Sequence, residues 1–444
     1  MSSTAEPATS TPERLWLVSE HLDDVLGRLR PLDPIELRLL DAQGCVLVED
    51  VTVPVALPPF DNSSMDGYAV RVADVAGASE EFPAVLTVIG DIAAGSGGQP
   101  RVGAGEAARI MTGAPLPPGA EAVVPVEWTD GGTGGGPATT MRAHSSAPEG
   151  ASGEVRVHRP VTERAHVRAR GSDAGAGELA LRAGTVLGPP QLSLLAAIGR
   201  DTVRVRPRPR VVVLSTGSEL VPPGEPLAPG QIYDSNSFAL AAAARDAGAI
   251  AYRVGAVTDD AATLRATIED QLIRADLLVT TGGVSVGAYD VVKEALTGLG
   301  DDTDGVQFRT LAMQPGKPQG FGFIGDADGG RDRAPLLALP GNPVSAYVSF
   351  ELFVRPAIRT LMGTTPVHRT VVSAICPEGV ASSLPGRRQF LRGRYDADAN
   401  AVTPVGGSGS HLVKALAHAN ALIVLPEDTT SLEPGGTVDV VLLD

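Results

Sequence analysis

The stretch RVVVLSTGSE (residues 210–219) decides the fold class, because an apolar run ends there in a loop of small polar residues. A run such as 210–214 is typical of a strand that is buried on both faces of a parallel sheet. Similar runs alternate along the chain with segments of helical periodicity. Strands are expected at 251–257, 276–280, two within 306–324, and 336–339, and helices at 238–247, 261–274, 290–299 and 344–361. This alternation predicts a mostly parallel, doubly wound α/β sheet over residues 204–363.

The segments on either side of this region follow other patterns. Apolar residues at helical spacing predict an amphipathic helix over 15–29, and 190–199 is expected to form a short second helix. Short β runs between Gly and Pro clusters predict a small β domain from 58 to 160, and a separate β module begins near 364. The expected runs are 35–40 and 46–53 with a turn at Gln43-Gly44, then 67–70, 84–89, 122–126, 370–374, 388–395, 421–425 and 438–443. The glycines within 131–136 predict a hairpin tip, with a phosphate cradle as the alternative.

Composition excludes several classes of protein. The chain has 444 residues, of which 43 % are hydrophobic and 20 % charged, so a disordered or fibrous chain is excluded. The 52 glycines and 36 prolines disfavour a helical bundle, and the net charge of −16 disfavours nucleic acid as a partner.

The cysteines, the histidines and the lack of targeting signals limit the compartment and the kind of metal site that we expect. Two distant cysteines, Cys45 and Cys376, give neither a disulfide framework nor a CxxC metal motif, which favours a reducing compartment. The seven histidines show no HxH or HExxH spacing, so a histidine-built metal site is disfavoured and a hard cation held by carboxylates stays open. Without a signal peptide or an apolar run of about 18 residues, we expect a cytoplasmic protein with no membrane contact.

Every predicted strand of the α/β region ends in a polar or Gly/Pro-rich loop. The carboxyl ends of parallel strands meet at one edge of a sheet, so these loops are expected to converge on one pocket. Their backbone amides and hydroxyls suit phosphate oxygens, and Lys317 adds a positive charge. The alternative is a set of ordinary strand-to-helix turns. The loops are 215–219, 258–260, 281–285, 314–318 and 340–343.

Three of these regions also supply carboxylates, namely Glu219, Asp259 and Asp290. Mg²⁺ prefers one or two carboxylates together with substrate phosphates, so a magnesium-bound phosphoanhydride fits this set of residues. The alternative is that the aspartates cap the helices that follow them.

Two other motifs point to catalysis only weakly. The segment Gly283–Gly287 has the G-x-S-x-G pattern of a serine hydrolase, with Ser285 at its centre, but the helix that should follow at once is delayed to about residue 290. Pro315-Gly-Lys317 is followed by proline, so it is no Walker A motif.

Five blocks of sequence together resemble the MoeA/gephyrin-E family, the molybdopterin molybdenumtransferases. The resemblance runs from about residue 15 to the C-terminus. The blocks are DNSSMDGYAV (61–70), RIMTGAP (109–115), STGSEL (215–220), TGGVSVG (281–287) and LPGNPVS (339–345).

The resemblance implies an elongated homodimer of four-domain subunits. Residues 14–57 and 161–203 would form a discontinuous dimerisation domain, and 58–160 a β insertion within it. Residues 204–363 would form the α/β molybdopterin-binding domain, and 364–444 a C-terminal β barrel.

The resemblance also implies a reaction. Adenylylated molybdopterin and molybdate would be converted into molybdenum cofactor and AMP, with Mg²⁺, at a site between domains three and four of one subunit and domain two of the other. Transient contacts with the preceding adenylyltransferase and with molybdoenzymes would follow. The resemblance also implies that molybdenum would need no protein ligand, because the dithiolene sulfurs of the pterin would hold it.

Residue roles carry over from the matching motifs. The implied catalytic residues are Asp66, Thr112, Glu219 and Lys317, and the implied metal ligands are Glu219, Asp259 (or the adjacent Asp260) and Asp290. Lys317, Arg392 and Ser410 would provide hydrogen bonds and charge to molybdate. The implied substrate-binding residues are Asp173, Asp259, Gly282, Gly283, Ser285, Pro340, Pro343, Arg392 and Ser410.

One departure and two alternatives accompany the resemblance. Many relatives have two lysines where this chain has Gln314-Pro-Gly-Lys317, so one positive charge is lost, and Arg387 and Arg388 are candidates to compensate.

A non-catalytic molybdopterin-binding scaffold is the first alternative function. The adenylyltransferase of the preceding step is the second, and the presence of domains two and four argues against it.

Overall fold

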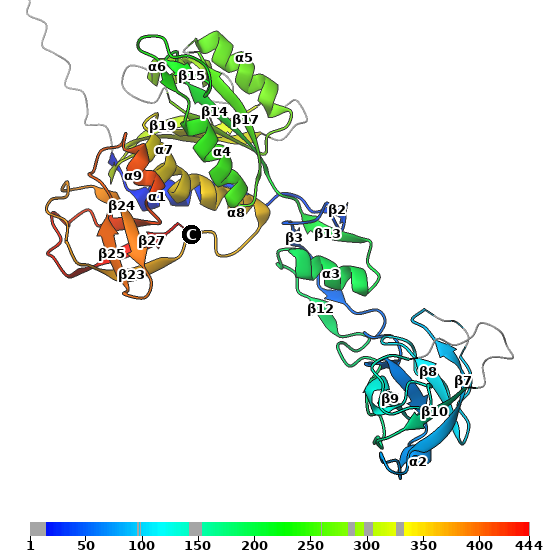
Figure 1. The fold of residues 1–444 in the computed structure, drawn as a ribbon. Helices are drawn as coiled ribbons and strands as arrows, with labels where there is room; N and C mark the ends of the chain where they lie inside the picture. Colours follow the sequence, from blue (N-terminus) through cyan, green and yellow to red (C-terminus); the bar gives the residue numbers. More distant parts are fainter. Residues whose placement is uncertain are drawn as a thin grey trace, which may run out of the picture. The chain divides into compact units, whose positions relative to one another are not determined.

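The structure is a computed structural model, which describes residues 15–95, 97, 99–141, 153–258, 260–282, 289–296, 305–325 and 333–443. The chain divides into two compact units (Figure 1). The larger unit comprises the N-terminal residues up to Leu37, Asp41–Val48 and Arg204 onward. The smaller unit comprises Arg38–Leu40 and Glu49–Val203.

A seven-stranded sheet forms the centre of the larger unit. Its last four strands, β22, β18, β14 and β17, are parallel, whereas β21 runs antiparallel to both of its neighbours. The order is β1 (Leu15–Trp16), β19 (Gln307–Leu311), β21 (Pro318–Ile324), β22 (Ala334–Leu339), β18 (Leu277–Thr281), β14 (Arg210–Thr216) and β17 (Ile250–Val257). The predicted α/β class is confirmed, with an antiparallel side to the sheet.

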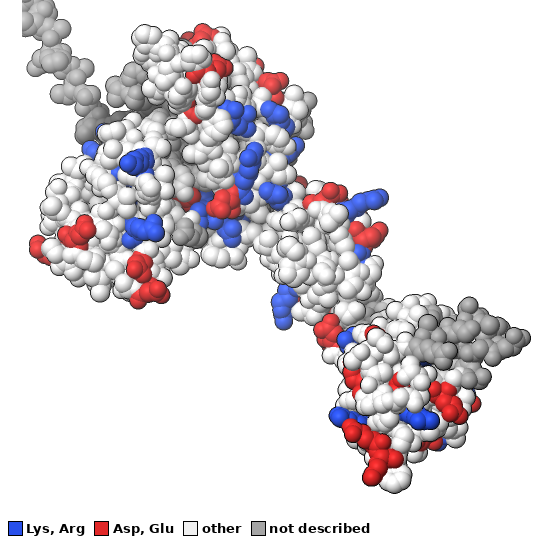
Figure 2. Space-filling view, in the orientation of Figure 1, with Lys and Arg blue, Asp and Glu red and all other residues white. Residues whose placement is uncertain are grey.

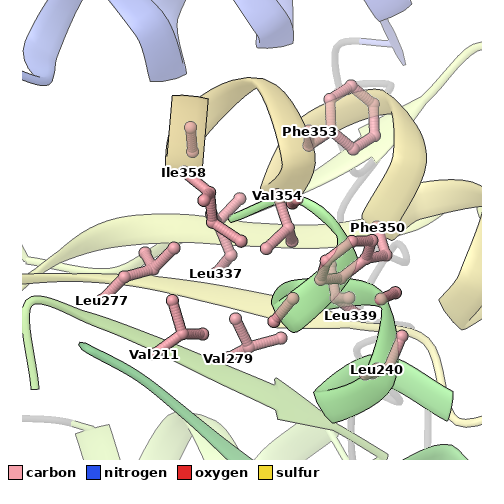
Figure 3. Close-up of a cluster of buried hydrophobic side chains, with 14 of the residues drawn as sticks. Val211, Leu240, Leu277, Val279, Leu337, Leu339, Phe350, Phe353, Val354 and Ile358 are labelled. Carbon is pink, nitrogen blue, oxygen red and sulfur yellow. The ribbon is translucent and has the colours of Figure 1, made fainter. Parts of the chain in front are cut away.

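Alternate residues of β14 face two different hydrophobic cores. Val211 and Val213 pack with Leu240 of α4 (Asn236–Asp246), whereas Val212 and Leu214 pack with Leu264 of α5 (Ala261–Leu272). Figure 3 shows the first core, in which strand side chains meet Leu240 and the helical residues from Phe350 to Ile358. Burial on both faces explains why the strand is apolar from Val211 to Leu214. Helix α6 (Tyr289–Leu296) adds Val292 to the second core.

The helix predicted over 344–361 is interrupted. It consists of α7 (Pro343–Ser349), a π-helical turn η4 (Phe350–Val354) and α8 (Arg355–Met362). Pro356 has no backbone N–H to donate to the preceding turn, and a wider π turn accommodates that missing bond.

The N-terminal helix packs in the larger unit. Helix α1 (Val18–Arg28) places Val18 and Val25 in the first core, beside η4 and α8. We expected this segment in the discontinuous first domain, but its apolar face is buried against the α/β core instead. The predicted start at residue 15 is also wrong, because Leu15–Trp16 extend as β1 beside β19.

The C-terminal strands close into a barrel, as predicted. Strand β24 pairs with both β25 and β26, which completes a ring of five strands, and β20 joins the outside of β24. The barrel order is β24 (Arg388–Asp396), β25 (Ala401–Pro404), β23 (Val371–Cys376), β27 (Gly436–Leu442) and β26 (Ala421–Leu425), with β20 at Met313–Gln314 and a short helix α9 at Val413–Ala417.

Two short sheets complete the larger unit. The strands expected at 35–40 and 46–53 do not pair with each other, because β13 (Thr202–Arg206) lies between β2 (Ile35–Arg38) and β3 (Val46–Leu47). The second run is also interrupted after Leu47 and resumes as the separate strand β4 (Val51–Thr52). Strands β15 (Leu220–Val221) and β16 (Ile232–Tyr233) form a parallel pair next to α4.

The smaller unit is mainly β structure, as predicted. Its five-stranded sheet has the order β10 (Gly153–Val157), β7 (Ala84–Ile92), β8 (Glu106–Ile110), β6 (Gly67–Val70) and β9 (Ala122–Pro125). Its remaining elements are β4 (Val51–Thr52) with β12 (Leu179–Leu181), β5 (Asn62–Ser63) with β11 (Val167–Arg168), α2 (Val72–Val75), a 3-10 turn η1 (Val126–Trp128) and α3 (Pro189–Ala197).

The glycine-rich loop of the smaller unit is organised around a buried carboxylate. Asp130 accepts hydrogen bonds from the backbone amides of Gly132, Gly134 and Arg156 at 2.9–3.0 Å. Because these amides are already used, the loop does not form the phosphate cradle considered above. Across the described residues, no helix is long and apolar enough to cross a membrane.

Candidate ligand-binding site

A cleft of about 580 Å³ lies at the carboxyl ends of β14, β18 and β22 in the larger unit. Three of the five predicted loops, 215–219, 281–285 and 340–343, line it, whereas no described residue of 258–260 or 314–318 does, so the predicted convergence is confirmed for three loops only. His411, in the loop before α9, and Val413, the first residue of α9, also line it. The lining residues are Thr216, Gly217, Glu219, Leu220, Ile232, Tyr233, Asp234, Ser235, Asn236, Thr281, Gly282, Gly341, Asn342, Pro343, His411 and Val413.

The strand ends approach one another so closely that Gly282 has no room for a side chain. Its φ is +102°, and an added Cβ would lie 2.2 Å from the Thr216 carbonyl oxygen. A Cβ on Gly341 would in turn lie 3.3 Å from the Gly282 Cα. Gly282 therefore lines the cleft as predicted, and its role is to let β14 and β18 meet backbone to backbone.

A side-chain network ties the loops together. Asn236 Nδ2 donates to Thr281 Oγ1 at 3.0 Å and to the Gly341 carbonyl at 2.7 Å. Thr281 Oγ1 donates to the Pro340 carbonyl at 2.9 Å. Predicted residue Pro340 thus holds the loop through its backbone. Asn236 belongs to none of the sequence motifs named above. The one feature of the sequence that could have pointed to it is its position as a polar residue at the start of a helix.

Asp234 is a second residue that the sequence did not reveal. Its side chain is buried, and it accepts from Ser215 Oγ at 2.9 Å and from both the amide and hydroxyl of Ser237. Arg253 Nη1 lies 4.0 Å from the same carboxylate. With both oxygens occupied, Asp234 orders the cleft wall and is not an open ligand. An acid three residues before a helical serine is the N-capping pattern that could have found it.

Glu219 is the open carboxylate of the cleft. Its oxygens lie over Gly217, since an added Cβ there would be 2.7 and 2.8 Å from them. The side chain is exposed and makes no hydrogen bond or ion pair with the described part of the chain. It is therefore free to face a cation or a ligand hydroxyl.

Thr216 contributes a hydroxyl without a partner. Its Oγ1 is buried at the cleft wall and has no hydrogen-bond partner among the described residues. Because a buried hydroxyl without a partner costs free energy, this atom is suited to a ligand oxygen.

The other predicted acids do not line the cleft with a described side chain. Asp259, Gly283 and Ser285 lie outside the described residues, and Asp290 belongs to α6, but its side chain is not described. Asp260, the alternative to Asp259, caps α5 by accepting from the Thr263 amide at 2.7 Å and hydroxyl at 2.6 Å. The Thr263 hydroxyl and amide together lower the pKa of Asp260. The described residues include no cluster of three acids, histidines or cysteines that could hold a metal.

Lys317 lies at the same sheet edge without lining the cleft. The antiparallel register pairs Gly320 with Ala338, which brings the start of β21 beside Pro340 at the end of β22. The Lys317 side chain is exposed. Pro343 opens α7 at the cleft, and the next amide, of Val344, donates to the Ser410 carbonyl at 3.0 Å.

Arg392 is buried behind the loop that carries Ser410. Its guanidinium donates to the Gly409 carbonyl at 3.2 Å and to the Gly407 carbonyl. Burial lowers the pKa of Arg392. We expected Arg392 and Ser410 to contact molybdate. In the structure neither lines the cleft, and Arg392 instead supports the loop that brings His411 to it.

Two predicted residues of the smaller unit meet directly. Asp66 Oδ1 accepts from the Thr112 amide at 2.7 Å and from its hydroxyl at 2.9 Å. The pairing of Gly67 with Ile110 between β6 and β8 brings them together. Asp173 is exposed in a turn after β11, with its backbone amide bonded to the Leu57 carbonyl at 3.0 Å.

The fold and cleft define a multidomain α/β protein whose ligand site lies at the carboxyl edge of its sheet, next to a C-terminal β barrel. Three family descriptions match consecutive segments. They are the MoeA N-terminal region (domain I and II) at residues 17–199, the probable molybdopterin binding domain at 212–360 and the MoeA C-terminal region (domain IV) at 375–443.

Relatives match nearly the whole chain. Molybdopterin molybdenumtransferase 2 of Mycobacterium tuberculosis (strain H37Rv) is 43 % identical over 95 % of this chain and 98 % of its own length. The molybdopterin molybdenumtransferase of Bacillus subtilis (strain 168) is 36 % identical over 91 % and 89 %. The structure of the molybdopterin biosynthesis moeA protein from Pyrococcus horikosii superposes with a TM-score of 0.72 at 33 % identity, over 97 % of this chain and 100 % of that one. The chain belongs to the MoeA family.

Proposed function

We propose that this protein is a molybdopterin molybdenumtransferase, which inserts molybdate into adenylylated molybdopterin and releases AMP. The observation that carries the proposal is the cleft at the carboxyl edge of the sheet, which combines an open Glu219 carboxylate with a buried, partnerless Thr216 hydroxyl. These groups suit a phosphorylated ligand with an accompanying cation, and they occur in a chain of the MoeA family.

The residues would share the work as follows. Thr216 Oγ1 would hydrogen-bond a phosphate oxygen, while Asn236 and Asp234 keep the strand-end loops in place. Lys317 would attract the tetrahedral oxyanion beside the cleft, at the same edge of the sheet. Ile232, Tyr233 and Val413 give the cleft a less polar wall suited to a ring system.

Magnesium is part of the proposal. Glu219 would hold the ion, and Asp259 and Asp290 are the further ligands that the resemblance implies. An open carboxylate beside a phosphate-binding cleft fits the small number of protein ligands that Mg²⁺ needs when substrate phosphates supply the rest. When bound, the ion would polarise the phosphoanhydride and offset its charge.

A homodimer is also proposed, and helix α3 supports it. Residues 183–199 contain no charged side chain, yet Leu195 is the only one of the nine residues of α3 that is buried. Figure 2 shows a largely uncharged surface over this segment. An apolar helix that its own subunit leaves exposed is suited to contact with a second copy. Asp66 and Thr112 would act on the substrate from the partner subunit.

The proposal also includes partner proteins and a reducing compartment. Contacts with an adenylyltransferase that supplies the substrate, and with molybdoenzymes that receive the product, follow from the proposed reaction. Cys45 and Cys376 are buried thiols without a disulfide, and burial raises the pKa of each, which suits a reducing compartment such as the cytoplasm.

AMP release tests the proposed function. The purified protein is incubated with adenylylated molybdopterin, Mg²⁺ and molybdate, and we expect AMP to form only when molybdate is present. Glu219→Gln should abolish release, whereas Glu269→Gln, at an exposed acid of α5 paired with Arg265, should not. Binding of the adenylylated pterin without any AMP release would instead favour the non-catalytic scaffold.

A further inference from the structure

The turn that carries Lys317 is held from beneath by a buried glutamine. Gln319 Nε2 donates to the Gly316 carbonyl at 2.7 Å and to Ser349 Oγ at 2.6 Å. Gln319 and Ser349 are 1 % and 0 % exposed. The amide therefore connects the peptide just before Lys317 to the end of α7, the helix that begins at the cleft.

The backbone on both sides of the turn is also tied. The Lys317 carbonyl accepts from the Leu311 amide at 2.7 Å, and β20, which leads into the turn, pairs with β24 of the barrel. Gly316 has a φ of +101°, and an added Cβ would lie 2.9 Å from Ser349 Oγ. The turn fits against Ser349 with no space to spare, so its conformation depends on this contact.

We propose that Gln319 and Ser349 are positioning residues that hold the Lys317 ammonium where it meets a tetrahedral oxyanion. The inference rests on the proposed function. Lys317 is the only positively charged residue of its turn, residues 314–318. A single ammonium on a flexible four-carbon stem attracts an anion effectively only when its backbone is held in place, so the buried amide strengthens anion binding by fixing the backbone at Lys317.

The oxyanion is either molybdate or a phosphate of the adenylylated pterin, and the kinetics separate the two. Gln319→Met removes both N–H donors and keeps a side chain of similar length. We expect the half-saturating concentration of one substrate to rise about five- to tenfold, with kcat changed less than about twofold. A rise for molybdate alone identifies molybdate, and a rise for the pterin alone identifies its phosphate.

A double-mutant cycle separates positioning from general support of the fold. If Gln319 acts through Lys317, then Gln319→Met adds less than about a twofold change in the Lys317→Ala background. If the two effects multiply, or if Gln319→Met lowers kcat alone, the inference is overturned. Gln271→Met is the matched control, because it removes another buried glutamine amide, on α5, and should leave both half-saturating concentrations unchanged.

Two measurements keep the test decisive. If Gln319→Met does not fold, Ser349→Ala takes its place, since it removes only the hydroxyl acceptor. Equilibrium dialysis with molybdate, and separately with adenylylated pterin, needs no turnover, so it tests positioning even if no AMP is released by the native protein. Unchanged binding of both ligands to the variant would overturn the inference, whereas absent AMP release with weakened binding would overturn the proposed function alone.

Discussion

Replacement of Gly282 by alanine tests the close approach of strand ends that shapes the cleft. The new Cβ would lie 2.2 Å from the Thr216 carbonyl oxygen and 2.8 Å from its hydroxyl. Thr216 ends β14, which is paired on both sides with β17 and β18, so it has little freedom to retreat. We expect a destabilised larger unit with a widened cleft.

The magnitude follows from two contributions. The left-handed backbone costs a residue with a Cβ about 1–2 kcal/mol, and overpacking a closed site costs about 1–3 kcal/mol. Gly282→Ala should therefore lower the free energy of unfolding by about 2–5 kcal/mol, a large share of the about 5–15 kcal/mol typical of a folded protein.

Urea denaturation followed by circular dichroism measures this loss. Gly224→Ala is the control, because Gly224 has a similar φ of +99° but nothing within 4 Å of an added Cβ. It should lose only the backbone contribution, about 1–2 kcal/mol. Equal losses for the two variants, or an unchanged urea midpoint for Gly282→Ala, would refute the close packing of β14 against β18.

Three further outcomes are expected. Gln314→Lys adds a second positive charge to the Lys317 turn, so it should tighten molybdate binding in a titration, and most strongly at low salt. A molybdate affinity that is unchanged at every salt concentration would contradict this. In the proposed homodimer, mixing Asp66→Ala with Glu219→Gln subunits should restore about a quarter of the native AMP release, because half of the dimers would be mixed and each would regain one of two sites. No recovery would contradict a site shared between two subunits. Asp260→Asn should destabilise α5 at neutral pH. Because the pKa of Asp260 is lowered, the difference in urea midpoint between the native protein and the variant should vanish as the pH falls below 3.8 and the native carboxylate is protonated. A constant difference down to pH 2 would argue against the cap.

Local patterns were sufficient to predict the strand-end loops of the cleft. Thr281–Gly282 and Gly341–Pro343 follow buried strands, and parallel strands bring their carboxyl ends together whatever the helices between them contain. Asp66 and Thr112 were predicted separately, from two motifs, and the structure joins them through the pairing of β6 with β8.

Residues that act through buried hydrogen bonds were not predictable in the same way. Asp234, Asn236 and Gln319 bond to partners on other elements, and a polar residue in a turn looks the same in the sequence whether its partner is water or another loop. Arg392 shows the converse. The family resemblance implied an oxyanion contact, but burial under the Gly407–Gly409 backbone directs its donors to carbonyls.

The sequence by itself determined the alternation of strands and helices, the polar loop after each strand and the family motifs, because all of these are short-range patterns of residue type. The tertiary structure alone decided that α1 joins the α/β core and that β13 separates β2 from β3. It also decided that the Glu219 carboxylate has no hydrogen-bond partner among the described residues, whereas both oxygens of Asp234 are hydrogen-bonded. These outcomes depend on which distant surfaces meet, and the free energy of burial and of pairing polar groups becomes defined only when they do.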